Sequence, residues 1–137
     1  MTITQTDKER LLAKFNGNPR ADEHLIRRFE TESGFRLPEE YAQFLQHANG
    51  GEGFVGNAYV ILWRVEELLE MNKAYRVAEL APGLLLFGSD GGGEAFAFDT
   101  RSGAKRIVSV PFVGMELKLA RAIAVDFKMF LEELFKS

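Results

Sequence analysis

The sequence predicts an α+β domain in which helices pack against a mostly antiparallel sheet of about four to five strands. Before residue 49 the apolar residues recur at helical spacing, whereas residues 57–110 contain short apolar runs rich in aromatic and β-branched side chains. Helical spacing returns after Asp126. Helices first, strands second and a closing helix are typical of the α+β class. A chain of 137 residues has the length of one domain, so we expect residues 1–137 to form a single unit.

Three helices are predicted before the first strand. Thr6 begins the sequence pattern of a capping box, which favours a short first helix there. A second helix spans about residues 22–33 and ends at Gly34, because glycine readily adopts the positive φ of a helix C-cap. Pro38 suits the first position of a third helix, and the Asn-Gly-Gly sequence at 49–51 ends it.

One strand and one helix are expected next. Residues 57–63, NAYVILW, are rich in β-branched and aromatic side chains, and this composition predicts a strand with Trp63 in the core. From Val65 to Tyr75 the apolar spacing is helical. A fourth helix should therefore end before the Pro-Gly pair at 82–83.

The stretch from Leu84 to Asp99, LLLFGSDGGGEAFAFD, is the centre of the predicted sheet. Its two apolar runs, 84–87 and 95–98, are short enough for buried strands and should pair with each other. Residues 89–93 supply glycines and one aspartate, which is typical of a hairpin connection. We expect at least one of these glycines to have a positive φ.

The end of the chain adds a third strand of the meander and the last helix. Residues 105–110 return after the polar turn at 99–103. Residues 112–125 fit either an irregular strand or an early start of the last helix. Asp126 is the predicted N-cap of that helix. One core should unite eight side chains: Leu37, Tyr41, Phe44, Trp63, Phe98, Phe127, Phe130 and Leu131.

Composition and charge narrow the possible functions. A net charge of -3 and a sequence pI near 5.5 disfavour nucleic-acid binding, which normally needs a basic surface. The chain has no cysteine, so a disulfide framework and a thiolate site are excluded. No apolar run approaches the length of a membrane span, and the N-terminus lacks the apolar core of a signal peptide. A cytoplasmic location is expected, and the oligomeric state is left open.

The residues capable of chemistry do not form a recognised motif. Asp90, Glu94 and Asp99 border the glycines, but the alternating acidic spacing of a calcium loop is missing. Asp90 and Glu94 could act as an acid and a base, yet a turn-forming Asp and a solvated Glu at a strand end explain them more simply. The glycines lack a phosphate-binding pattern. We predict no catalytic residue, no metal ligand and no cofactor.

The two histidines and two large aromatic residues have structural explanations. His24 should be exposed near a helix start, and a protonated His47 should favour the negative end of the third helix. Neither lies near a serine or cysteine motif that it could activate. Tyr41 and Trp63 are expected to pack in the core rather than to line a ligand pocket.

Two motif blocks resemble the SUKH superfamily. The first contains Leu-Pro, Tyr, Phe-Leu and Asn-Gly-Gly between residues 37 and 51; the second is the Gly/Asp-rich hairpin at 87–99, and Asp-Phe at 126–127 resembles the closing helix. The resemblance covers about residues 22–136, with Glu94 replacing the usual Asp. The motif residues, expected to be structural, are Leu37, Pro38, Tyr41, Phe44, Asn49, Gly50, Gly88, Gly91, Gly92, Gly93, Phe127 and Phe130.

The resemblance implies an α+β protein-binding module without a reaction of its own. For a small bacterial member it implies an immunity protein that binds and neutralises a polymorphic toxin; the superfamily also contains fungal cell-wall assembly regulators. The candidate residues for contacting the toxin domain are Glu52, Asp90, Glu94 and Asp99. The alternative is a small hydrolase or ligand-binding enzyme that uses the carboxylates near the hairpin.

Overall fold

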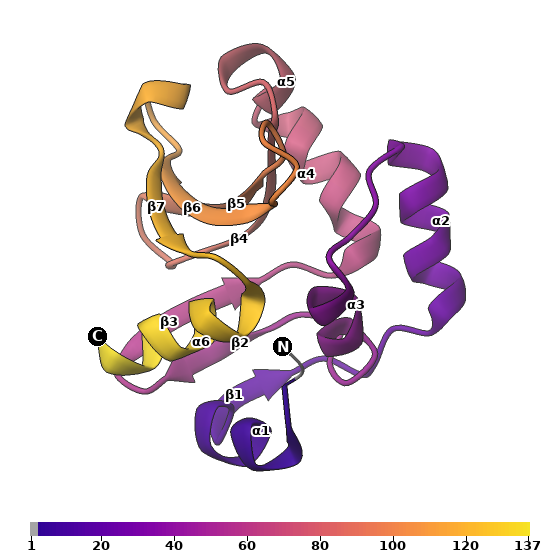
Figure 1. Ribbon diagram of the computed structural model, residues 1–137, viewed down its shortest axis with the longest axis vertical. Helices are drawn as coiled ribbons and strands as arrows, with labels where there is room; N and C mark the ends of the chain where they lie inside the picture. The colour runs from indigo at the N-terminus through magenta and orange to yellow at the C-terminus, as the bar shows by residue number, and fades with distance from the viewer. Residues whose placement is uncertain (1–2) are drawn as a thin grey trace.

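A computed structural model describes residues 3–137 and confirms the α+β class (Figure 1). All neighbouring strands are antiparallel and lie in chain order, β1 to β7, so the sheet has more strands than the four to five expected. The elements of the described residues are α1 (Gln5–Leu11), β1 (Lys14–Gly17), α2 (Glu23–Ser33), α3 (Glu39–Leu45), β2 (Gly51–Val55), β3 (Ala58–Leu62), the 3-10 helix η1 (Val65–Glu67), α4 (Leu68–Ala74), α5 (Val77–Leu80), β4 (Leu84–Ser89), β5 (Glu94–Asp99), β6 (Arg106–Pro111), the 3-10 helix η2 (Leu117–Leu119), β7 (Arg121–Ala124) and α6 (Phe127–Lys136).

The N-terminal helices differ from the prediction mainly at their ends. Thr4, not Thr6, is the N-cap of α1, because Thr4 and Asp7 exchange the two hydrogen bonds of a capping box. Helix α2 begins after Asp22 and ends at Gly34, which has a φ of 72°, as predicted. Pro38 is the N-cap of α3 rather than its first residue.

Two strands, β1 and β2, were not predicted from the sequence. Glycines in β2 allow β1 to approach closely: an added Cβ on Gly51 would lie 2.3 Å from the Asn16 carbonyl oxygen, and one on Gly53 would lie 2.6 Å from that of Lys14. The glycines after α3 therefore do more than end a helix. Because they lack a Cβ, they also let β1 pair with β2 at the edge of the sheet.

The predicted hairpin between β4 and β5 is present. Residues 90–93 connect the two strands, and Gly91 has a φ of 80°. Asp90 Oδ1 accepts hydrogen bonds from the backbone N–H groups of Gly92, at 2.8 Å, and of Glu94, at 3.2 Å. Asp90 thus organises the turn, as the sequence suggested.

The sheet bends where β3 meets β4 (Figure 1). Only two residue pairs join these strands, Ile61 with Ser89 and Leu62 with Gly88. Next to this short ladder the side-chain amide of Asn72, on α4, takes over strand pairing. It donates to the Leu86 carbonyl oxygen and accepts from the Leu86 N–H, both at 2.9 Å. Asn72 therefore fastens α4 to β4 where β3 no longer covers the backbone.

The ambiguous segment 112–125 contains η2 and the edge strand β7, so the strand alternative was the better one. Asp126 is the N-cap of α6, and its side chain accepts a hydrogen bond from Met129 N–H, as predicted. In Figure 1, α6 lies across the sheet in front of β2 and β3.

The predicted core is confirmed, since all eight of its side chains are buried. Aromatic rings form its centre. The ring centroid of Tyr41 lies 5.0 Å from that of Phe98, 5.2 Å from that of Phe127 and 5.5 Å from that of Phe87. Phe130 packs edge-on against Phe87 at 5.4 Å. Trp63 is also buried, and its ring stacks on that of Tyr75.

Candidate protein-binding surface

One face of β2 and β3 remains open to solvent. The register places Glu52 opposite Ile61 and Phe54 opposite Tyr59, while the alternate residues of both strands point toward the core. Phe54 is 46% exposed and Tyr59 is 36% exposed. We call the side chains of Glu52, Phe54, Tyr59 and Ile61 the aromatic face.

The groups of the aromatic face hold one another in place. The rings of Phe54 and Tyr59 meet edge to face, with centroids 5.2 Å apart. The Tyr59 hydroxyl donates a hydrogen bond to the Glu52 carboxylate, and this bond raises the pKa of Tyr59. The hairpin loop borders the same face, because an added Cβ on Gly91 would lie 3.0 Å from Tyr59 Cδ2. These contacts present two aromatic rings and one carboxylate in a fixed arrangement.

The four candidate carboxylates do not form one cluster. Glu52 belongs to the aromatic face, and Asp90 lies in the neighbouring hairpin loop. The register places Glu94 on the same face of β5 as Phe96, which is opposite to the aromatic face. Arg121 Nη2 lies 4.0 Å from Glu94 Oε1. Asp99 is at the opposite end of β5, about 17 Å from Glu94 at the usual rise of a strand.

Asp99 is also neutralised within the chain. Arg101 Nη2 lies 2.8 Å from its Oδ2, and the Arg101 guanidinium holds the pKa of Asp99 below its ordinary value. The structure therefore leaves Asp99 apart from the other three carboxylates, with its charge largely balanced.

The histidines occupy separate surface positions. His24 is exposed on α2, as expected. His47 lies beyond the end of α3, and partial burial together with the nearby Lys8 lowers its pKa. Both effects disfavour the protonated imidazole, so they oppose the expected stabilisation of the helix end by a protonated His47. Among residues 3–137, no three His, Cys, Asp or Glu side chains lie close enough together to hold a metal ion.

The residues of the first motif block have structural contacts. Buried Asn49 accepts a hydrogen bond from Val65 N–H through Oδ1 and donates one to Glu66 through Nδ2, which links the turn after α3 to η1. An added Cβ on Gly50 would lie 2.4 Å from the Leu62 carbonyl oxygen. Sequence spacing could not reveal these contacts, because they join segments that are distant along the chain.

The glycine positions of the second motif block differ in whether, and why, they require glycine. An added Cβ on Gly88 would lie 2.4 Å from the Ile61 carbonyl oxygen, so this position needs glycine for strand approach. Gly91 needs it for its positive φ. Gly93 has open space around it.

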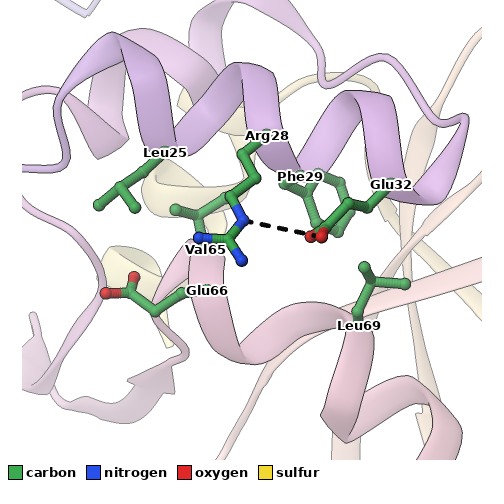
Figure 2. A pocket seen from close by; sticks show the side chains of 7 residues that line it. All are labelled: Leu25, Arg28, Phe29, Glu32, Val65, Glu66 and Leu69. Atoms are coloured by element: carbon green, nitrogen blue, oxygen red, sulfur yellow. Dashed lines mark ion pairs between the residues drawn. The ribbon is translucent and has the colours of Figure 1, made fainter.

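A small cavity lies between α2 and the η1–α4 segment (Figure 2). Its volume is about 180 Å³, and an ion pair of Arg28 Nε with Glu32 Oε2, 3.6 Å long, runs along its α2 side. Glu66 at its edge binds the Asn49 amide. Its charged side chains thus have partners within the chain. The residues that line the cavity are Leu25, Arg28, Phe29, Glu32, Val65, Glu66 and Leu69.

These features define a small α+β domain whose exposed aromatic face adjoins a glycine-rich hairpin. The chain matches the SMI1 / KNR4 family (SUKH-1) over residues 20–133, and it belongs to this family. The family consists generally of non-enzymatic immunity and regulatory proteins that bind other proteins. No curated protein matches the chain. None of the helices within residues 3–137 has the length and apolar character needed to cross a membrane.

Proposed function

We propose that this chain is a bacterial immunity protein that binds the toxin domain of a cognate polymorphic toxin in the cytoplasm and blocks its action without catalysing a reaction. The aromatic face carries this proposal. Exposed Phe and Tyr rings that adjoin each other are typical of the centre of protein interfaces. The whole chain, residues 1–137, acts as one binding domain in this proposal.

The pre-arranged contacts of the aromatic face favour tight binding. Phe54 and Tyr59 already restrain each other, so a partner would order few additional rotatable bonds when it covers them. Glu52 supplies a carboxylate beside the rings, and the net charge of -3 favours a partner with a basic surface. Many toxins that attack nucleic acids present such a surface.

We assign unequal roles to the four candidate carboxylates. Glu52 lies beside the rings and Asp90 lies in the adjacent hairpin loop, and both contact the toxin domain directly in this proposal. Glu94 contributes from the neighbouring side of the hairpin. Asp99 acts only at the rim, because Arg101 balances its charge.

The test is a titration of the purified chain against the C-terminal toxin domain encoded by an adjacent reading frame, together with a growth-rescue assay. Tyr59→Ala should weaken binding at least about tenfold, a change of about 1.4 kcal/mol, because it removes a central ring and the partner of Glu52. Leu80→Ala is the matched control, since Leu80 is exposed to a similar extent on α5.

The salt dependence of the association rate separates long-range electrostatic attraction of the toxin domain from direct contact with it. Glu52→Gln should slow association at low salt, and high salt should reduce the difference from the wild type. Absence of both binding and growth rescue by the wild-type chain would reject the immunity proposal. Turnover of a small substrate that is lost on Asp90→Asn or Glu94→Gln would replace it with an enzymatic function.

A further inference from the structure

A groove separates the β5–β6–β7 part of the sheet from the last turn of α6. Its volume is about 440 Å³, within the range of about 300–1,000 Å³ typical of small-molecule sites. The strand register places Phe96, Ser109 and Arg121 in one row on the same sheet face. Asp90 enters from the hairpin, Glu94 from β5 and Glu133 from α6. The groove is thus lined by the β4–β5 hairpin loop together with β5, β6, β7 and α6.

The carboxylates of the groove keep acceptor capacity. Asp90 uses Oδ1 for the loop amides. Glu94 has only the 4.0 Å approach of Arg121, whose side chain is 77% exposed. Glu133 meets Lys136 at 3.6 Å, outside the groove lining. Weak pairs of this kind leave the three carboxylates able to accept hydrogen bonds from an incoming cation.

Ser109 gives an independent indication of a ligand. The residue is only 4% exposed and lines the groove, yet its hydroxyl has no hydrogen-bond partner within the described part of the chain. The other buried serine of the sheet, Ser89, accepts a hydrogen bond from Gly91 N–H. The Ser109 hydroxyl oxygen is not one of the sealed, unpartnered side-chain atoms of the described residues, so it is accessible from the groove. A donor placed in the groove could therefore bond to Ser109.

We propose that this groove binds the guanidinium group of an arginine side chain of the protein partner. The inference rests on the proposed function, because the arginine belongs to the toxin domain. A guanidinium has five donors in a planar fork, which suits acceptors at several positions better than the compact ammonium of lysine does.

Arg121 provides a guanidinium from the chain itself. It lies at the edge of the groove and reaches Glu94 only at 4.0 Å. Arg121 therefore competes weakly with the incoming arginine. Removal of Glu94 and removal of Arg121 should consequently have opposite effects on binding.

The test uses ethylguanidinium chloride as the probe and the full, isotope-labelled chain as the receptor, with sodium chloride at equal ionic strength as the reference. Saturable NMR shifts are expected at the amides of Glu94, Phe96 and Ser109, with a dissociation constant in the millimolar range. Glu94→Gln and Ser109→Ala should each weaken binding by roughly threefold or more, and Arg121→Gln should strengthen it by about twofold. Glu116→Gln, which removes another exposed and ion-paired carboxylate, should change nothing.

Several results would overturn the proposal: no saturable shift, equal binding of butylammonium, or wild-type affinity in Glu94→Gln. Dispersed amide spectra of the variants verify that they are folded. The probe does not depend on the toxin, so the two proposals fail separately. A groove that binds the probe while the toxin domain shows no binding would reject the proposed function and the toxin as the source of the arginine, and would leave only a guanidinium site. A toxin domain that binds while the probe shows no shift would reject only the groove.

Discussion

Two groups of aromatic side chains have similar ring geometry and opposite surroundings. In the buried group, Tyr41 meets Phe98 with centroids 5.0 Å apart and an interplanar angle of 61°. In the exposed pair, Phe54 meets Tyr59 at 5.2 Å and 76°. The rings of the first pair are 1% exposed, and those of the second are 46% and 36% exposed. Ring contact alone therefore does not distinguish a pair that stabilises the fold from a pair that is accessible to a partner, whereas the exposed fraction does.

The largest expected difference between the two groups is in stability. Phe130→Ala should lower the free energy of unfolding by about 3–5 kcal/mol, because Phe130 is fully buried among other rings. Phe54→Ala should lower it by less than about 1 kcal/mol, since much of that ring is already in water. Urea unfolding of both variants measures this difference. Equal losses would show that burial does not separate the two groups.

The hairpin that borders the exposed pair should respond next most strongly. Gly91→Val should cost about 1–3 kcal/mol, because Gly91 has a φ of 80° and its added side chain would press on Tyr59. Gly93→Val is the control, as Gly93 has open space and no positive φ. Thermal unfolding compares the two variants. Similar melting temperatures would contradict the assigned role of Gly91.

Tyr41 and Tyr59, one from each group, extend the comparison to their hydroxyl groups. The Tyr41 hydroxyl is buried, has no hydrogen-bond partner among residues 3–137, and has a pKa raised by burial. Tyr41→Phe should therefore stabilise the chain by about 1–2 kcal/mol. Tyr59→Phe should leave stability nearly unchanged, because its hydroxyl bonds to Glu52 in contact with water. Chemical unfolding of both variants measures these changes, and a loss of stability in Tyr41→Phe would contradict this account.

The smallest effect concerns His47, a ring that belongs to neither group. Partial burial and Lys8 lower its pKa in the folded state, so the unfolded chain binds a proton more readily. The resulting stability is present above the unfolded pKa, near 6.5, and is lost as the pH falls through the folded pKa. His47→Gln should flatten this pH dependence of unfolding, and His24→Gln is the control. An unchanged slope in His47→Gln would reject the assignment.

The sequence predicted the parts of the fold that repeated local patterns determine. Helices α2 and α6 have clear apolar spacing and capping aspartates, and the β4–β5 hairpin has two continuous apolar runs around a glycine turn. Strand β1 has no such pattern, because it is a short edge strand with little burial. Strand β2 was missed because Gly51 and Gly53 are more typical of turns, and only the approach of β1 explains them.

The candidate site was predictable only in part. The sequence identified Glu52 and the hairpin carboxylates as exposed charges, but it could not show that Asp99 is balanced by Arg101 or that Glu94 lies on another face. Alternation in residues 58–62 could have indicated that Tyr59 points away from the core. Its partner Phe54 lies in the strand that the sequence did not reveal. The aromatic face therefore depended on strand register, which arises from tertiary structure.

The chain-order arrangement of the seven strands has a consequence for how the domain forms and varies. Each strand pairs only with the strands before and after it, so no strand must be threaded between two that have already paired. Such topologies close short loops first and are expected to fold faster than those with distant strand pairing. A connection such as residues 90–93 can also change length without moving any strand to a new neighbour. The loop at residues 90–93 can thus change in length and sequence while the order of strand pairing stays the same.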